Sequence, residues 1–453
     1  MIILKQAALL LTLVGFFVYG QMAFAADEQN GAASDVPNFI RIPVFYLTDR
    51  CRLDDGKSKA VDFGIERQYF GVCKHDPFLG VAYCTIKNAE HKPLSASCEN
   101  LGWQASKHDG EGPDGITVFS GAKYEDVKNN FYEELYRKST PTKDHELFMF
   151  APGYMSTFES GLRSAARLAY YAERPVLFYS WASKGKFTGY FADEATIEWT
   201  QDHFNDAIAR LTELGQRTPA LRVRLFAHSM GGRLVLRATP LLKSNSTFKE
   251  VSVVCPDVDD GVVKHYAAKY FDGKGNQLVR LYVSKRDVML RISQLVHGGY
   301  SRFGEDREPL DNLIPKNERT VVEVAEPGST IAAPASASNA CFGSLSRKLL
   351  TIDFTAVDIG TLGHRIPVEL LCSLSQRGEP GQGLSLCIAR QKVVRGKIRD
   401  SISTSSSEDE SDPDDGIIKV LSDKRWHGTP LIGLAVKYRP RIQLLLTKDW
   451  SLK

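Results

Sequence analysis

The sequence has no large excess of charge of either sign and few long apolar runs. Its 57 Lys and Arg residues nearly balance its 54 Asp and Glu residues, so the formal net charge is +3. A dominant nucleic-acid-binding surface is therefore not expected. The mean hydropathy of −0.23 excludes a protein with many membrane spans. The chain also has no internal repeat.

Motifs for several metal- or phosphate-dependent functions are also missing. The sequence contains no Gly-rich phosphate loop, no zinc motif and no pair of glycosidase carboxylates. Its cysteines show no CxxC spacing and have no histidine beside them at ligand spacing. We therefore expect neither a metal nor a cofactor.

The composition is that of a globular protein, because 43% of the 453 residues are hydrophobic and 10% are aromatic. At the start of the chain, Lys5 precedes an uncharged apolar run over residues 7–19, and Ala23-Phe24-Ala25 offers a cleavage site. This pattern is typical of a secretory signal peptide over residues 1–25. The run is short for a membrane span, which needs about 20 residues. We predict an exported protein, periplasmic or secreted, with an uncleaved N-terminal membrane anchor as the alternative.

Export makes disulfides possible for the eight cysteines. The pairs closest in sequence that we consider are Cys73–Cys84 and Cys372–Cys387, although spacing alone does not determine pairing. Cys255 lies inside the apolar run VSVVC, so we expect it to be a buried free thiol.

Strands and helices alternate over most of the chain. Continuous apolar runs such as ELFMFA predict strands that are buried on both faces. Alternation of this kind predicts an α/β fold with a mostly parallel sheet flanked by helices. The predicted strands are 39–48, 116–119, 146–151, 176–181, 223–227, 251–255, 278–283 and 349–354, and the predicted helices are 124–137, 156–172, 193–214 and 229–238.

The α/β core is predicted over residues 39–370, after a flexible leader over 26–38. A Cys-containing elaboration over 50–115 and a loop insertion over 326–345, which is rich in small residues, interrupt the core. Residues 371–453 form a C-terminal extension, and its Ser-rich, acidic linker over 401–415 is predicted to be disordered.

The strongest chemical motif is Ala227-His228-Ser229-Met230-Gly231-Gly232, which lies between a predicted strand and a predicted helix. Small residues on both sides of a serine allow the tight strand-to-helix turn called a nucleophile elbow. The serine is then exposed at the carboxyl edge of the sheet, and the helix N-terminus favours negative charge there. We predict that Ser229 is a nucleophile.

A serine nucleophile needs a base, and the base needs an acid that orients it. In this architecture both follow the serine in the chain, each after a later strand. Asp287 and His364 hold these positions. The rival acids Asp257, Asp259 and Asp260 follow the preceding strand, and the rival base His297 follows a helix; we favour Asp287 and His364.

An oxyanion hole needs two backbone N–H donors. Met230, which follows the serine, is expected to supply one, and Tyr154 or Met155 in the loop after the ELFMFA strand is expected to supply the other. The segment over residues 181–199 carries several aromatic residues and is a candidate cap that contacts an acyl group.

Several segments together carry a resemblance to known proteins. They are Val44–Arg50 (VFYLTDR), Gly153-Tyr154 with Thr157-Phe158, Ser180–Ser183 (SWAS), Ala227–Gly231, Ser284–Asp287 and Gly363-His364. The chain resembles α/β-hydrolases, and specifically a bacterial family of esterase- or lipase-like serine hydrolases of unknown function. The resemblance covers roughly residues 40–370. The sequence departs from the lipase-like pattern at Pro152-Gly153, where His-Gly is usual, and at Met155, where Asn is usual.

Together these features predict an exported serine hydrolase that cleaves carboxylic esters through Ser229, His364 and Asp287. The expected partner is a small-molecule or lipid ester, and peripheral membrane contact is left open. One alternative is a hydrolase-like binding or scaffold protein without activity. Another is a peptidase, thioesterase or acyltransferase on the same fold.

Overall fold

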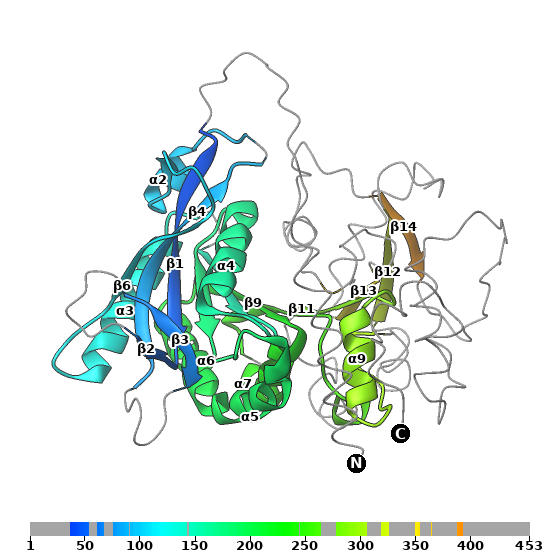
Figure 1. Cartoon of the computed structure of the whole chain (residues 1–453). Coiled ribbons are helices and arrows are strands. Elements are labelled where there is room, and N and C mark those ends of the chain that lie inside the picture. Colours follow the sequence, from blue (N-terminus) through cyan, green and yellow to red (C-terminus); the bar gives the residue numbers. More distant parts are fainter. Residues whose placement is uncertain are drawn as a thin grey trace.

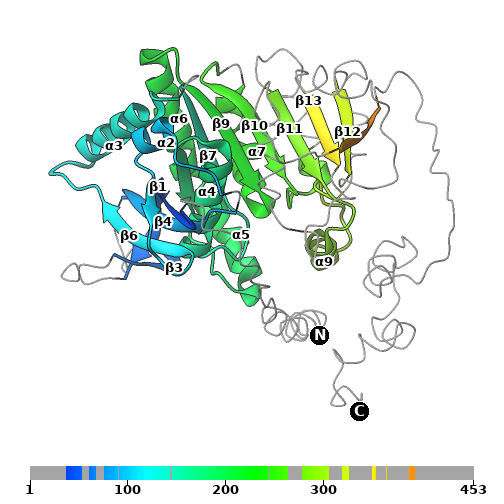
Figure 2. The same cartoon turned by 90° about the horizontal axis from the view of Figure 1, so that it is seen from above.

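The computed structural model is built around one large sheet with helices on both faces (Figures 1 and 2). It describes residues 37–53, 61–67, 76–89, 91–142, 145–243, 245–263, 278–305 and 364, and the backbone alone of residues 319–325, 349–353 and 387–392. The predicted signal peptide, the loop insertion over 326–345 and the linker over 401–415 lie outside these residues.

The large sheet has twelve strands in the order β14-β12-β13-β11-β10-β9-β7-β8-β1-β4-β6, with β5 paired to β1. The eight strands from β12 to β1 in this order run parallel, whereas β4, β5, β6 and β14 pair antiparallel. The strands are β1 Phe39–Thr48, β4 Phe78–Lys87, β5 Gln104–Ser106, β6 Gly112–Val118, β7 Glu146–Ala151, β8 Val176–Ser180, β9 Arg222–His228, β10 Phe248–Val254, β11 Leu278–Val283, β12 Arg319–Ala325, β13 Leu349–Asp353 and β14 Cys387–Lys392. A separate hairpin pairs β2 (Arg50–Arg52) with β3 (Phe63–Arg67).

Each central strand contributes side chains to two apolar cores, because successive residues of a strand point to opposite faces. In β7, Leu147, Met149 and Ala151 belong to one core, and Phe148 and Phe150 belong to the other. The first core packs against α3 (Tyr124–Ser139), α6 (Gln201–Arg217) and α7 (Gly232–Leu242), and the second packs mainly against α4 (Phe158–Ala172). The remaining helices are α2 Ala96–Asn100, η1 Phe187–Gly189, α5 Tyr190–Trp199, η2 Ser229–Gly231 and α9 Val288–Val296.

This arrangement confirms the predicted α/β fold and corrects some of its elements. The long helix predicted over 193–214 is two helices, because α5 ends at Trp199 and α6 begins at Gln201. The helix predicted to begin at residue 156 begins instead at Phe158, where Thr157 and Ser160 form a capping box. The elaboration over 50–115 supplies strands β4 and β6 to the large sheet.

The disulfide prediction Cys73–Cys84 is wrong, because Cys84 is a free, buried cysteine. Its side chain lies in the second core, in the middle of β4. Cys98 and Cys255 are also free and buried, which confirms the prediction for Cys255, whereas Cys51 is disulfide-bonded. Cys73 and the pair Cys372–Cys387 are not tested, since Cys73 and Cys372 lie outside the described residues.

In the described part of the chain, no helix has the length and hydropathy needed to cross a bilayer.

Candidate active site

Ser229 lies at a sharp turn between the end of β9 and the helix α7. Its φ of 52° is in the left-handed region, which is rare for a residue with a Cβ atom. The turn is tight, since a Cβ atom on Gly231 would lie 2.5 Å from the carbonyl oxygen of Pro152. The surrounding chain therefore holds Ser229 in a strained conformation, as the sequence motif predicts for a nucleophile elbow.

Three predicted residues meet at the carboxyl edge of the sheet. His364 Nε2 lies 2.8 Å from Ser229 Oγ, and His364 Nδ1 lies 2.6 Å from Asp287 Oδ2. Burial by itself lowers the pKa of His364, but the Asp287 carboxylate more than offsets this, so the pKa is raised above its ordinary value. Ser229 is 3% exposed and Asp287 is fully buried, so water screens these interactions little.

The Asp287 carboxylate is held in place by its surroundings. Its Oδ1 accepts the backbone N–H of Leu290 at 3.0 Å, as the N-cap of α9. The thiol of Cys255 also donates to this carboxylate, and burial raises the pKa of Cys255 well above its ordinary value. Among the described residues, potential metal ligands gather only at Cys255, Asp287 and His364, whose ligand atoms lie within 4.8 Å of one another.

His228 contacts the same histidine from the other side. Its Nε2–H donates to the backbone carbonyl of His364 at 3.1 Å, and the two rings lie 4.8 Å apart. Burial, together with the charge of His364, lowers the pKa of His228 well below its ordinary value. A neutral His228 therefore ties the segment that carries His364 to the end of β9.

The three predicted oxyanion donors differ in availability. Met230 is in the first turn of a helix, where N–H groups lack partners within the helix. Tyr154 N–H has no hydrogen-bond partner among the described residues, and its neighbour Gly153 lies against Ser229. Met155 N–H, in contrast, donates to the carboxylate of Asp193. Among the described residues, the N–H groups of Met230 and Tyr154 are thus without a partner outside the helix, whereas that of Met155 is engaged.

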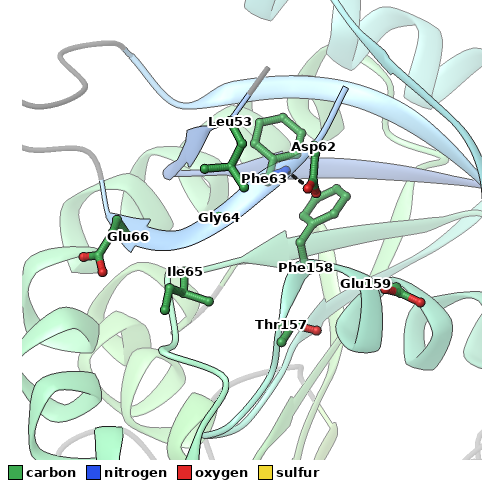
Figure 3. Close-up of a pocket in the computed structure, with 9 residues that line it drawn as sticks. All are labelled: Leu53, Asp62, Phe63, Gly64, Ile65, Glu66, Thr157, Phe158 and Glu159. Atoms are coloured by element: carbon green, nitrogen blue, oxygen red, sulfur yellow. Dashed lines mark hydrogen bonds between the residues drawn. The ribbon is translucent and has the colours of Figure 1, made fainter. Parts of the chain in front are cut away.

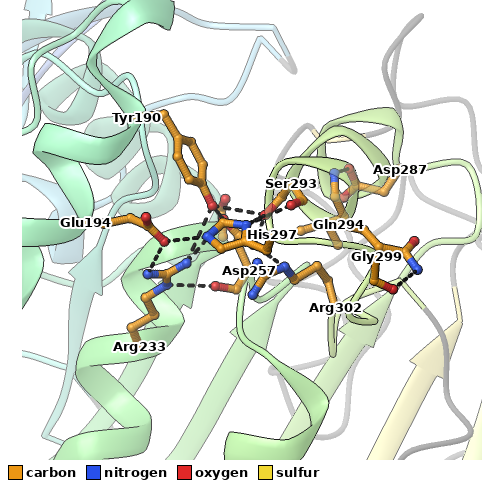
Figure 4. A network of polar contacts seen from close by, with 12 residues as sticks. Tyr190, Glu194, Arg233, Asp257, Asp287, Ser293, Gln294, His297, Gly299 and Arg302 are labelled. Atoms are coloured by element: carbon orange, nitrogen blue, oxygen red, sulfur yellow. Dashed lines mark hydrogen bonds and ion pairs between the residues drawn. The ribbon is translucent and has the colours of Figure 1, made fainter. Parts of the chain in front are cut away.

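The rival acid Asp257 and the rival base His297 lie in a neighbouring polar network (Figure 4). Asp257 Oδ1 accepts Ser293 Oγ–H at 2.6 Å, and His297 Nε2 lies 2.7 Å from Glu194. The other two rival acids follow on the same loop, where Asp259 accepts the N–H of Gly261. None of these rivals has a hydrogen bond to the side chain of Ser229 or His364 among the described contacts.

Aromatic side chains border the loop that carries Tyr154. The rings of Tyr154 and Tyr190 lie 5.1 Å apart, edge to face, and Phe191 on the same helix is 58% exposed. Tyr190 and Phe191 come from the segment over residues 181–199 that is predicted to form a cap.

A separate hollow of about 390 Å³ lies between the β2–β3 hairpin and the start of α4 (Figure 3). Phe63 and Phe158 line it, and none of the predicted site residues does.

Comparison with known protein families agrees with the fold. Residues 127–327 match the family model described as alpha/beta hydrolase of unknown function (DUF900). The chain is a member of the α/β-hydrolase superfamily. No curated protein is significantly similar to this hydrolase in sequence.

Solved structures similar to the hydrolase include the phospholipase PlaB from Legionella pneumophila, alone and in complex with thio-NAD. Both are 10% identical to it over 40% of its length, with TM-scores of 0.26 and 0.25. The matched region spans about half of each PlaB chain, 48% and 47%.

Sequence reasoning missed two residues of this region, Arg50 and Asp193, and it missed the contact of His228 with His364. Arg50 ends the VFYLTDR motif that carries the family resemblance, and a charged residue after a buried strand was the available signal. Asp193 resembles an ordinary charge in the first turn of a helix, and only the fold reveals that it is fully buried.

Proposed function

We propose that this hydrolase cleaves carboxylic esters through a covalent acyl-enzyme, with Ser229 as nucleophile, His364 as base and Asp287 as the acid that orients it. The observation that carries the proposal is the hydrogen-bonded row Ser229–His364–Asp287, with distances of 2.8 and 2.6 Å. The left-handed conformation of Ser229 at a strand-to-helix turn supports the same assignment.

In the first step, Ser229 Oγ attacks the ester carbonyl carbon while its proton moves to His364 Nε2. The imidazolium that forms keeps its Nδ1–H on Asp287, whose buried carboxylate stabilises the positive charge. The negative charge on the former carbonyl oxygen is stabilised by the N–H groups of Met230 and Tyr154. Met155 has no part in this hole, because its N–H is bound to Asp193.

In the second half, His364 returns the proton to the alkoxide, and the alcohol leaves an acyl group on Ser229. Water then attacks this acyl group and gives up a proton to His364, so that a carboxylic acid is released and Ser229 Oγ–H is restored. The aromatic pair of Tyr154 and Tyr190 beside the loop supports an apolar acyl group.

The decisive experiment is labelling of the purified protein with a fluorophosphonate, followed by peptide mapping. We expect label on Ser229 alone and none in Ser229→Ala. The matched control is Ser293→Ala, since Ser293 is also buried and lies 3.4 Å from a histidine, His297; this variant should label like the wild type. Absence of label on folded wild-type protein would instead support a binding or scaffold protein.

The class of bond is tested with nitrophenyl esters, thioesters and anilides that carry the same acyl chains. We expect turnover of esters to exceed that of anilides, with a preference for medium-length chains over acetate. Anilide turnover as fast as ester turnover would favour the peptidase alternative. Vesicles of a phospholipid test whether lipid esters are accepted.

We also propose that the chain is exported and that residues 1–25 are removed. The disulfide at Cys51 supports this proposal, because disulfides persist mainly in oxidising compartments. Fractionation of cells followed by N-terminal sequencing should find protein that begins at Ala26 outside the cytoplasm. A membrane-bound chain that retains Met1 would support the anchored alternative.

A further inference from the structure

The loop between β7 and α4, residues 152–157, carries the proposed oxyanion donor Tyr154 and is held from several sides. The indole N–H of Trp181 donates to the carbonyl of Pro152 at 2.8 Å. The Tyr154 hydroxyl donates to the carbonyl of Phe187. These contacts fix the two ends of the Pro152–Tyr154 segment against the chain after β8.

Two buried charged residues complete this set of contacts. The carboxylate of Asp193 accepts the N–H of Met155, and it also accepts Ser183 Oγ–H at 2.6 Å and Lys184 N–H at 2.7 Å. Three donors thus converge on one carboxylate that is fully buried. Two of them come from the loop after β8 and one from the loop after β7, so Asp193 joins the two loops.

Arg50 binds the same two loops from the other side. Its Nη2 donates to the carbonyl of Ser156 at 2.6 Å, its Nη1 donates to the carbonyl of Ser183 at 3.0 Å, and its Nε donates to Ser180 Oγ at 3.0 Å. Arg50 is fully buried, and burial lowers its pKa to about 10. Its positive charge favours ionised Asp193, whose pKa burial raises.

Met155 lies between these two anchors in a strained conformation. Its φ of 62° is in the left-handed region, where residues with a Cβ atom are rare and the conformation costs of order 1 kcal/mol or more. The hydrogen bond from Met155 N–H to Asp193 offsets this cost. Without it, we expect the chain at Met155 to relax and the adjacent Tyr154 N–H to move away from Ser229.

We propose that Asp193, supported by Arg50, is a positioning residue for the oxyanion hole: its carboxylate holds Met155 in the left-handed conformation that directs Tyr154 N–H toward the reacting oxygen. This inference rests on the proposed function. Asp193 does not touch the substrate, and it acts through the loop that does.

The test compares Asp193→Asn with the matched control Asp49→Asn. Asp49 is an equally buried carboxylate near Arg50, but it is bound to Thr200 and His203, not to the loop. Active sites are counted by the fluorophosphonate burst, so that kcat is expressed per competent Ser229. We expect Asp193→Asn to lower kcat about 10- to 100-fold with KM little changed, because misplacement of an oxyanion donor acts on the transition state.

Two further readouts separate positioning from loss of stability. A boronic acid, which forms a tetrahedral adduct on Ser229, should lose affinity in Asp193→Asn by about the factor that kcat loses. Met155→Gly in the Asp193→Asn background should recover part of kcat, because glycine adopts positive φ without strain. Asp49→Asn should lower thermal stability but leave kcat and boronate affinity near wild type.

Wild-type kcat and boronate affinity in folded Asp193→Asn would overturn the proposal. If Asp193→Asn does not fold, Ser183→Ala is measured in its place, because it removes one donor to Asp193 without removing the charge. This variant should lower kcat and boronate affinity together, by a smaller factor than Asp193→Asn. No change in either quantity would overturn the proposal. Absence of ester turnover in the wild type would remove the proposed function itself and this inference with it.

Discussion

The left-handed backbone of Ser229 depends on small neighbours. A Cβ atom on Gly231 would meet two backbone oxygens, of Pro152 at 2.5 Å and Ala151 at 2.8 Å. Backbone atoms cannot rotate away as a flexible side chain can, so the turn would have to open. The close approach therefore links the shape of the elbow to the position of the oxyanion loop.

We predict that Gly231→Ala destabilises the fold by about 1–3 kcal/mol and abolishes fluorophosphonate labelling. The matched control is Gly110→Ala, because a Cβ atom there meets nothing within 4 Å. Urea denaturation and labelling of both variants test this prediction. A Gly231→Ala protein with wild-type stability and labelling would contradict the geometry of the elbow.

The pKa of His364 predicts the pH dependence of activity. The proposed base must be neutral, and the pKa of His364 is raised above its ordinary value of 6.5. Activity should therefore fall as the pH falls through a value above 6.5. The effect on stability has the opposite sign: the stability that comes from the charged histidine is full below the unfolded pKa and is lost as the pH rises through the folded pKa.

In Asp287→Asn the acid limb of the kcat/KM profile should move to lower pH, because burial then acts on His364 without a carboxylate beside it. The rate at the optimum should fall about 10⁴-fold, as it does when other triads lose their acid. Asp257→Asn is the control, since Asp257 contributes less to the pKa of His364. An unchanged acid limb in Asp287→Asn would contradict the assignment.

At the scale of elements, four central strands are joined by buried charges at their amino ends, opposite the candidate active site. Arg224 of β9 lies 2.9 Å from Glu146 of β7 and 2.6 Å from Glu250 of β10. Arg280 of β11 lies 3.0 Å from Glu250 on its other side. Burial by itself raises the pKa of Glu250, but the two arginines more than offset this and lower it.

We predict that Glu250→Gln destabilises the fold by about 3–5 kcal/mol, because it leaves buried arginine charges without their partner. Glu125→Gln, which neutralises an exposed carboxylate paired with Lys128 and Arg210, should change stability little. Because the pKa of Glu250 is lowered, the stability it contributes is present above its unfolded pKa of about 4.3 and is lost as the pH falls through the folded value. Urea denaturation at pH 7 and at lower pH tests both statements, and equal effects of the two variants would contradict the first.

The predicted elements that agree with the structure are those whose sequence pattern reflects burial. ELFMFA matches β7, and FIRIPVFYLT matches β1. The strand β4, FLGVAYCTIK, was missed because its apolar residues are mixed with Gly and Cys in a segment rich in charge. The break at Thr200 was missed because α5 and α6 form one amphipathic pattern, and the turn between them is set by contacts of Thr200 with Tyr179 and Asp49.

On the scale of the whole molecule, the described free thiols report on global unfolding. Cys84, Cys98 and Cys255 are buried in the same core. Burial also raises the pKa of Cys84 to about 12, so little of the reactive thiolate forms at neutral pH.

We predict that iodoacetamide modifies these three thiols in native protein only slowly and at a common rate, set by opening of the whole core. In urea they should react quickly, while Cys51 reacts only after reduction. Mass spectrometry of tryptic peptides over time measures each rate. Rapid alkylation of one thiol in native protein would show that its part of the core opens separately.

The sequence was enough to predict the residues of the candidate site, but not the contacts that hold them in position. Chain order and the strand-to-helix motif were enough to select Ser229, Asp287 and His364, which the fold brings within hydrogen-bonding distance. The sequence could not distinguish Tyr154 from Met155 as a donor, because the choice depends on Asp193, whose carboxylate reaches Met155 across the fold. Local patterns identify groups at strand ends, whereas contacts between distant loops require the three-dimensional structure.

The position of His364 in the chain has a consequence for synthesis. Its Nε2 meets Ser229 across 135 residues of sequence, and its carbonyl is bound to His228. A ribosome therefore completes the serine turn well before it adds the histidine. Until that segment emerges and docks on His228, Ser229 lacks its hydrogen bond to His364. The proposed triad is therefore assembled only after most of the sheet has been translated.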